Sequence, residues 1–187
     1  MEVENHIFKN VRFLQSPNYN DRPDKEKISL LIIHCISLPK GGYEGSNVED
    51  FFLNKLSISD HNSFDEIKDL KVSSHLYIKR NGELVQFVPF NKRAWHAGES
   101  TYKGVSDCNN YSIGIELEGT DDDLYTDDQY DTLIEATKGV IKNYPLINKD
   151  SIVGHSDVSP GRKTDPGSKL DWGRFLEALW LKGIQSK

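Results

Sequence analysis

The chain has 187 residues, of which 36% are apolar and 28% are charged. A chain of this size and composition can bury a sizeable core, which excludes a disordered tail, a fibre and a disulfide-stabilised miniprotein. Its 23 Lys and Arg residues against 29 Asp and Glu residues give a formal net charge of −6. Because this charge generates no field that attracts nucleic acid or an anionic membrane, we expect neither as a partner.

The sequence shows no sign of export or of a domain boundary. Two cysteines, Cys35 and Cys108, are too few for a disulfide framework, and the opening MEVENHIFKN lacks the basic and apolar regions of a signal peptide. No apolar run approaches the roughly 18 residues that a membrane span needs. With no repeat, low-complexity tract or linker, we expect one domain over residues 1–187, acting as a monomer in the cytoplasm.

The first regular elements are a strand and a short helix. The continuous aliphatic run at 28–35 is typical of a strand buried on both faces. Proline and three glycines make 36–46 a loop. The segment 47–56 then predicts a short helix capped by Asn47.

A hairpin follows. Two apolar runs at 72–79 and 83–90 flank Asn81-Gly82. This dipeptide between two such runs is the strongest short hairpin signal, so we expect two antiparallel strands.

The segment 111–119 alternates between two kinds of residue. One face carries the aliphatic residues Ile113, Ile115 and Leu117, and the other carries Gly114, Glu116 and Glu118. This period of two predicts a half-buried strand that displays carboxylates on its second face.

Two amphipathic helices complete the pattern. Thr126 and Gln129 form a capping box, and apolar residues recur at three- and four-residue spacing until Pro145. A closing helix begins near Asp171 and is expected to turn five large side chains inward: Trp172, Phe175, Leu176, Leu179 and Trp180. With a short strand at 151–155 between the helices, the order of elements predicts an α/β or α+β fold in which helices sandwich a β-sheet.

Three polar residues lie where apolar runs give way to loops. His34 ends one run, His155 ends another, and Asp165 follows ten positions later. Two imidazoles and one carboxylate bind zinc and leave the fourth position for water, as in a catalytic site. A single histidine at a strand end is more often a core or surface residue, and the other histidines compete for the role: His6, His61, His75 and His96.

Neighbouring residues add candidates for catalysis. Pro166 restricts Asp165 to extended geometry within a rigid turn, although the aspartate could simply cap that turn. Lys163, two positions earlier, would face the same way and could meet an oxyanion, or remain a solvated cation. Glu116 could be a desolvated general base with a raised pKa, or a solvent-facing strand residue.

Five segments carry a resemblance to known proteins: PNYNDRPD, IIHCISLP, NKRAWHAGES, CNNYSIGIELEGTDDDLYTDDQY and GHSDVSPGRKTDPG. Together they resemble the zinc N-acetylmuramyl-L-alanine amidases, and within them the cytoplasmic 1,6-anhydro-N-acetylmuramyl-L-alanine amidase (AmpD) family. The resemblance covers nearly the whole chain. It implies a mixed central β-sheet flanked by helices, as in peptidoglycan recognition proteins.

The resemblance also implies roles for five residues. His34, His155 and Asp165 match the ligands of one zinc ion, Glu116 matches the acid/base carboxylate and Lys163 matches the lysine on the oxyanion side. The family cleaves the amide between the lactyl group of N-acetylmuramic acid and the L-alanine of the stem peptide. We therefore expect a small muropeptide substrate and a role in cell-wall recycling.

Candidates for substrate contact are Trp95, Arg162 and His75. Arg162 could pair with a stem-peptide carboxylate or be a surface charge. Trp95 could pack on the sugar or peptide, or be a core aromatic residue. His75 shares a strand face with Ser73 and Tyr77, where it lines the cleft or satisfies a buried neighbour.

Three positions depart from the familiar pattern. Enterobacterial members commonly carry Asn at Cys35 and Arg at Lys71 and Asp107. An aspartate at 107 weakens any expectation that this site grips the carboxylates of a diaminopimelate stem, so the preferred stem peptide stays open. Cys35 follows His34 on an alternating strand and should point to the opposite face, as a core thiol and not a fourth ligand.

Two alternatives to a recycling amidase remain. A binding module of this fold would sense peptidoglycan without cutting it, but such a module would lack a metal ligand. A broader, autolysin-type amidase would act on intact N-acetylmuramyl peptides and would need export.

Overall fold

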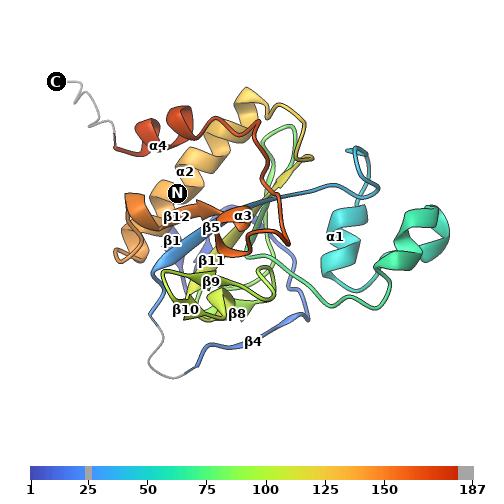
Figure 1. Ribbon diagram of the computed structural model, residues 1–187, viewed down its shortest axis with the longest axis horizontal. Helices are drawn as coiled ribbons and strands as arrows, with labels where there is room; N and C mark the ends of the chain where they lie inside the picture. Colours follow the sequence, from blue (N-terminus) through green and yellow to red (C-terminus); the bar gives the residue numbers. More distant parts are fainter. Residues whose placement is uncertain (24–26, 181–187) are drawn as a thin grey trace.

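A six-stranded mixed sheet forms the centre of the structure, a computed structural model that describes residues 1–23 and 27–180 (Figure 1). In spatial order its strands are β12 (Ile152–Gly154), β5 (Leu30–Ile36), β11 (Ser112–Glu118), β6 (Leu76–Ile78), β7 (Leu84–Gln86) and β3 (Arg12–Phe13). The β6–β7 pair is antiparallel and the other pairs are parallel. The predicted sheet flanked by helices is confirmed.

Shorter elements surround this sheet. Three two-stranded ribbons pair β1 (Val3–Glu4) with β2 (Ile7–Phe8), β4 (Tyr19–Asp21) with β8 (Lys92–Ala94), and β9 (Thr101–Tyr102) with β10 (Val105–Ser106). The α-helices are α1 (Asn47–Phe52), α2 (Asp127–Asn143), α3 (His155–Val158) and α4 (Trp172–Trp180), and the 3-10 turns are η1 (Ile58–Asp60), η2 (Asn62–Glu66), η3 (Cys108–Asn110) and η4 (Lys149–Ser151). Within the described residues, no helix is both long and apolar enough to span a bilayer.

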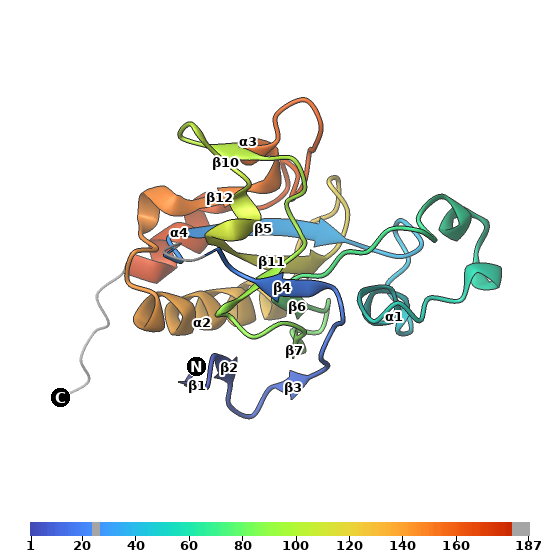
Figure 2. The same cartoon turned by 90° about the horizontal axis from the view of Figure 1, so that it is seen from below.

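Alternation along β5 divides the sheet into two faces. Leu31 and Ile33 belong to the larger core, which α2 and α4 cover on one side of the sheet (Figure 2). Leu30 and Ile32 point the other way, into a smaller core beneath α3. His34 continues the series of Leu30 and Ile32, so it emerges on this second face at the carboxyl end of the strand.

The strand β11 differs from the prediction. Every residue from Ser112 to Glu118 is buried, with Glu116 8% and Glu118 6% exposed, so the predicted half-buried strand is wrong. The physical reason is a second layer on the polar face: the ring of His96 packs directly over Gly114, where an added Cβ would lie 2.6 Å from it. Alternation marks a polar face but does not say whether that face meets water.

The predicted starts of α2 and α4 are confirmed. Thr126 and Gln129 form the capping box of α2, and the Asp171 side chain accepts a hydrogen bond from the Arg174 amide at the start of α4. Trp180, predicted to point inward, is 43% exposed. It lies about 100° further round the helix than Leu179, which does pack against the core.

The predicted helix at 47–56 is shorter than expected. It ends at Phe52, and Ser46, not Asn47, occupies its N-cap position. Asn54 adopts a left-handed φ of 58°, which no helix continues. The predicted hairpin is confirmed as β6–β7, although its strands are shorter than the apolar runs at 72–79 and 83–90.

A buried carboxylate fixes α1 against the sheet. The Glu49 side chain is 4% exposed and lies 2.6 Å from the Arg12 guanidinium and 2.5 Å from the Lys79 ammonium. Arg12 extends from β3 and Lys79 follows β6, so the two cations tie the helix to both strands. The segment from α1 to η2 projects beyond the carboxyl end of β5, on the side where His34 lies (Figure 2).

We expect Glu49→Gln to lower the free energy of unfolding by about 1–3 kcal/mol, because it leaves two cations facing a neutral amide in a buried position. Urea unfolding would measure the change. Glu83→Gln is the matched control: Glu83 contacts the same two cations but is 39% exposed, so its loss should cost less than about 1 kcal/mol. Equal losses in the two variants would contradict the anchoring role of Glu49.

Candidate metal centre

His34 and His155 lie at the ends of neighbouring parallel strands. Gly154, the last residue of β12, pairs with Ile33 of β5. The residue that follows each of these two is a histidine, and neighbouring parallel strands end at the same edge of a sheet. The sequence thus places both imidazoles side by side, at the type of edge where open sheets build their sites.

Asp165 reaches this edge through a turn that packs against the end of β12. Its carbonyl oxygen accepts a hydrogen bond from the Ser156 amide at 3.0 Å. A Cβ on Gly154 would lie 2.9 Å from Cδ of Pro166, so only glycine allows this approach. The turn therefore holds the carboxylate beside the two rings.

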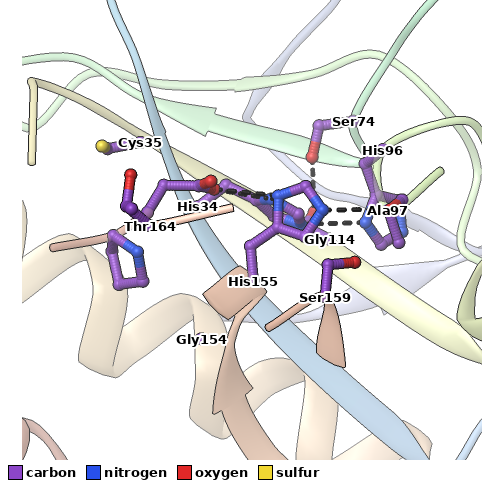
Figure 3. Close-up of polar contacts among 12 residues, drawn as sticks. His34, Cys35, Ser74, His96, Ala97, Gly114, Gly154, His155, Ser159 and Thr164 are labelled. Carbon is purple, nitrogen blue, oxygen red and sulfur yellow. Dashed lines mark hydrogen bonds and ion pairs between the residues drawn. The ribbon is translucent and has the colours of Figure 1, made fainter. Parts of the chain in front are cut away.

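The three side chains converge on one point. Figure 3 labels the two imidazoles of this group, His34 and His155. Nδ1 of His34 lies 3.0 Å from Nδ1 of His155 and 3.2 Å from Oδ2 of Asp165. Nδ1 of His155 lies 3.0 Å from the same carboxylate oxygen. The predicted group is therefore brought together.

The donor pattern shows that this group fits a cation. Nε2 of His155 lies 3.0 Å from the carbonyl oxygen of Ala97, which can only accept, so Nε2 carries the proton of the neutral ring. Nδ1 of His155 then presents a lone pair toward the carboxylate of Asp165, which also only accepts. Two nitrogens and one oxygen at this spacing suit a zinc ion with an open fourth position.

Burial and charge put these groups in the protonation states that bind a metal. Burial lowers the pKa of His34 to about 4, although the neighbouring Asp165 carboxylate opposes the shift, so the ring is neutral at pH 7. Burial by itself raises the pKa of Asp165, but its close contacts with the His155 and His34 imidazoles outweigh burial and hold that pKa below its usual range. The carboxylate is therefore ionised.

Glu116 lies next to the metal group. It pairs with His34 in the parallel register of β11 and β5, which places both side chains on the same face. Among the residues that the structure describes, Oε2 of Glu116 has no hydrogen-bond partner, although the side chain is buried. Burial raises the pKa of Glu116 well above its usual range, the Asp165 carboxylate adds to the rise, and Lys163 opposes it.

A cavity of about 260 Å³ opens beside these groups. Glu116, Lys163 and the three candidate ligands are among the residues that line it. Its apolar wall comes largely from the α1–η2 segment and the chain on either side of that segment, with Leu38, Phe51, Phe52, Ile67, Leu70 and Val72. Lys163 also lines an adjoining polar cavity of about 390 Å³, so it stands between the two.

Trp95 and Arg162 take different places around the site. Trp95 lines the cavity of about 260 Å³ beside the metal group, and its indole N–H donates to Oδ1 of Asn20 at 2.8 Å. Arg162 lines the polar cavity, where Nη2 donates to the carbonyl oxygens of Ala97 at 2.6 Å and Glu99 at 2.7 Å. That nitrogen holds a loop, and the predicted contact of Arg162 with a substrate carboxylate stays a prediction.

His75 lies beneath the site. It is fully buried, its Nδ1 accepts a hydrogen bond from the Gly114 amide at 3.1 Å, and its Nε2 donates to the Lys92 carbonyl at 3.0 Å. Burial lowers its pKa to about 3. Both ring nitrogens thus serve the packing of the sheet, and the predicted substrate contact of His75 stays a prediction.

His96 and Cys35 lie near His34 but outside the converging group. Nδ1 of His96 lies 2.9 Å from Nε2 of His34, a contact across 62 residues that no local pattern signals. Cys35 pairs with Leu117, on the face opposite His34, and packs partly buried against the larger core. It is not in the converging group, as alternation predicts.

The other two departures lie apart from the ligands. Lys71 lines a small cavity of about 110 Å³ with Ile67 and Leu70, which also form the apolar wall of the main cavity. Asp107 precedes η3 with a left-handed φ of 56°. Lys71 is therefore the one of the two that borders the main cavity wall.

Comparisons of the sequence and of the structure with known proteins find the same kind of enzyme. The sequence profile of the N-acetylmuramoyl-L-alanine amidase family matches residues 24–168. A relative from Haemophilus influenzae, 1,6-anhydro-N-acetylmuramyl-L-alanine amidase AmpD, is 48% identical over 95% of this chain and 97% of its own length. A crystal structure of a selenomethionine AmpD derivative has 46% identity and a TM-score of 0.93, covering 96% of this chain and 99% of that one.

A more distant structure carries a ligand. It is the N-acetylmuramyl-L-alanine amidase AmiD from Escherichia coli in complex with the substrate anhydro-N-acetylmuramic acid-L-Ala-D-γ-Glu-L-Lys. It has 29% identity and a TM-score of 0.59, and the match covers 84% of this chain and 60% of that one.

We expect Glu116→Gln to stabilise the metal-free protein at about pH 8. Because the raised pKa makes the folded state bind more protons than the unfolded state, stability falls as pH rises above the usual value of 4.5. The gain from the variant should shrink toward pH 4.5, with a slope of at most about 1.4 kcal/mol per pH unit. Urea unfolding of the two proteins across this range would measure it.

Glu118→Gln is the matched control on the same strand face. Its carboxylate accepts hydrogen bonds from the Tyr77 hydroxyl and the Arg80 amide, each at 2.8 Å, so its loss should destabilise the protein. A Glu116→Gln variant that is less stable than wild type at pH 8 would contradict the prediction.

Proposed function

The chain belongs to the N-acetylmuramoyl-L-alanine amidase family, and we propose that it cleaves the amide between the lactyl group of 1,6-anhydro-N-acetylmuramic acid and L-alanine in small muropeptides. It is a hydrolase of a linear amide with a role in peptidoglycan recycling. The observation that carries the proposal is the convergence of His34, His155 and Asp165 beside the unpartnered carboxylate of Glu116.

His34, His155 and Asp165 would hold one zinc ion, which supplies a polarised scissile carbonyl and an acidified water molecule when bound. Glu116 accepts a proton from the attacking water, because its carboxylate is desolvated and faces the cavity. It then returns a proton to the departing nitrogen of L-alanine. This transfer makes the amine a better leaving group.

Lys163 supplies positive charge where negative charge develops. It lines the same cavity as Glu116 and Asp165. The ammonium group stabilises the oxyanion of the tetrahedral intermediate, a contribution that is stronger in a site partly shielded from water. Trp95 and the apolar wall pack against the substrate and exclude solvent, and Arg162 remains our candidate for a stem-peptide carboxylate.

We expect the purified protein to release the stem peptide from an anhydro-muramyl tripeptide. A strong chelator should abolish release and added Zn²⁺ should restore it, because the reaction would require the ion that His34, His155 and Asp165 would hold. Chromatography of the products would measure the reaction, with an intact N-acetylmuramyl tripeptide as the second substrate.

Each outcome selects one of the candidate functions. Faster release from the anhydro substrate supports a recycling amidase, and equal release from both substrates indicates a broader amidase. Binding without cleavage by the zinc-loaded protein would identify a recognition module. Cleavage that survives complete metal removal would disprove the metal centre.

We expect Glu116→Ala and Lys163→Ala each to retain zinc but to lose about 100-fold or more in kcat/KM, the usual loss for a general base or an oxyanion donor. Metal analysis and steady-state kinetics would separate the two effects. Lys169→Ala, an exposed lysine in the same loop region, is the control and should keep wild-type rates. Full activity in either test variant would remove that residue from the mechanism.

A further inference from the structure

A third histidine contacts the candidate metal group from outside. Nδ1 of His96 lies 2.9 Å from Nε2 of His34 (Figure 3), whereas His155 and Asp165 contact the other ring nitrogen, Nδ1. The two rings meet edge to face, with centroids 5.0 Å apart and an interplanar angle of 84°. This is the geometry of an N–H on one ring that points at the lone pair of the other.

The direction of this hydrogen bond follows from the metal group. A metal ligand at Nδ1 of His34 carries no proton there, so the proton of the neutral ring is on Nε2. Nε2 therefore donates, and Nδ1 of His96 accepts. The remaining N–H of His96, at Nε2, faces the hydroxyl oxygen of Ser112 at 3.3 Å, which can accept it.

Contacts with neighbouring residues restrict the position of the His96 ring. The ring covers Gly114, where an added Cβ would come within 2.6 Å of it. The amide of His96 donates to Oδ1 of Asn109 at 3.2 Å, and the ring packs edge to face on His75 at 5.6 Å. His96 is thus held before any metal binds, and it can impose its orientation on His34.

Ala97, the residue after His96, accepts a hydrogen bond from the second imidazole of the group, His155. The Ala97 carbonyl oxygen accepts from Nε2 of His155 at 3.0 Å, and Arg162 holds this carbonyl at 2.6 Å. Metal-bound histidines usually donate their second N–H to a carboxylate, a carbonyl or water. Here one two-residue segment supplies both partners, and the partner of His34 is an imidazole.

We propose that His96 is a positioning residue of the metal centre, which accepts a hydrogen bond from Nε2 of His34 and thereby aims Nδ1 of His34 at the metal. The inference rests on the proposed function only in taking His34 as a ligand. His96 as a neutral acceptor fixes the tautomer of His34 without adding a negative charge beside the metal.

The test compares variants that keep or remove the acceptor. In His96→Asn, Oδ1 takes a place close to that of Nδ1 and can still accept, whereas His96→Leu fills similar space without accepting. Competition with a chromophoric chelator should show that His96→Leu binds Zn²⁺ about 10- to 100-fold more weakly than wild type, the usual loss for an outer partner of a ligand. His96→Asn should stay within about threefold of wild type.

Nuclear magnetic resonance gives a second readout, which starts from the wild-type protein. In the zinc-loaded wild-type protein, Nε2 of His34 should carry a slowly exchanging proton, and this signal should persist in His96→Asn and disappear in His96→Leu. His61→Leu is the control, because His61 is exposed and its ring hydrogen-bonds to the nearby Ser63, away from the candidate ligands.

The failures of the two proposals are distinguishable. A wild-type protein that binds no Zn²⁺ overturns the metal centre and the proposed function. If wild type binds Zn²⁺, equal affinities of His96→Leu and wild type, equal losses in both His96 variants, or no proton on Nε2 of His34 would each overturn the positioning role of His96.

Discussion

The central constraint on this structure is the convergence of three electron-pair donors. Nδ1 of His34, Nδ1 of His155 and Oδ2 of Asp165 lie 3.0–3.2 Å from one another at a largely buried edge of the sheet. Lone pairs at this spacing repel unless a proton or a cation lies among them, so the fold must hold them there. Parallel pairing of β12 with β5 fixes the two histidines, and the turn against Gly154 fixes the aspartate.

The rest of the site follows from the same face of the sheet. Alternation along β5 and β11 puts His34 and Glu116 side by side, while the opposite faces of the two strands enter the core under α2 and α4. Burial of that core makes the sheet edge rigid, and burial of Glu116 makes its carboxylate a stronger base. The α1–η2 segment then adds an apolar wall, which Glu49 secures to the sheet.

Local patterns predicted what depends on neighbours in sequence, and missed what depends on contacts across the chain. An apolar run located β5, alternation located β11 and the capping box located α2, because each signal is complete within a few residues. The same alternation led to the wrong prediction that β11 is half-buried, because no local pattern shows that His96 covers Gly114. The contact of His96 with His34 could not be predicted for the same reason. The two residues lie 62 positions apart, and only the folded sheet brings them together.

The site also illustrates why stability and chemistry oppose each other. An unpartnered carboxylate at Glu116 is costly in the folded protein, because desolvation favours its neutral form. A hydrogen-bond donor aimed at Oε2 would stabilise the fold, but it would also lower the basicity of the carboxylate and occupy the place where water must lie. The metal-free protein therefore keeps an electrostatic defect in a buried strand, and this defect becomes useful only once a cation and a substrate complete the site.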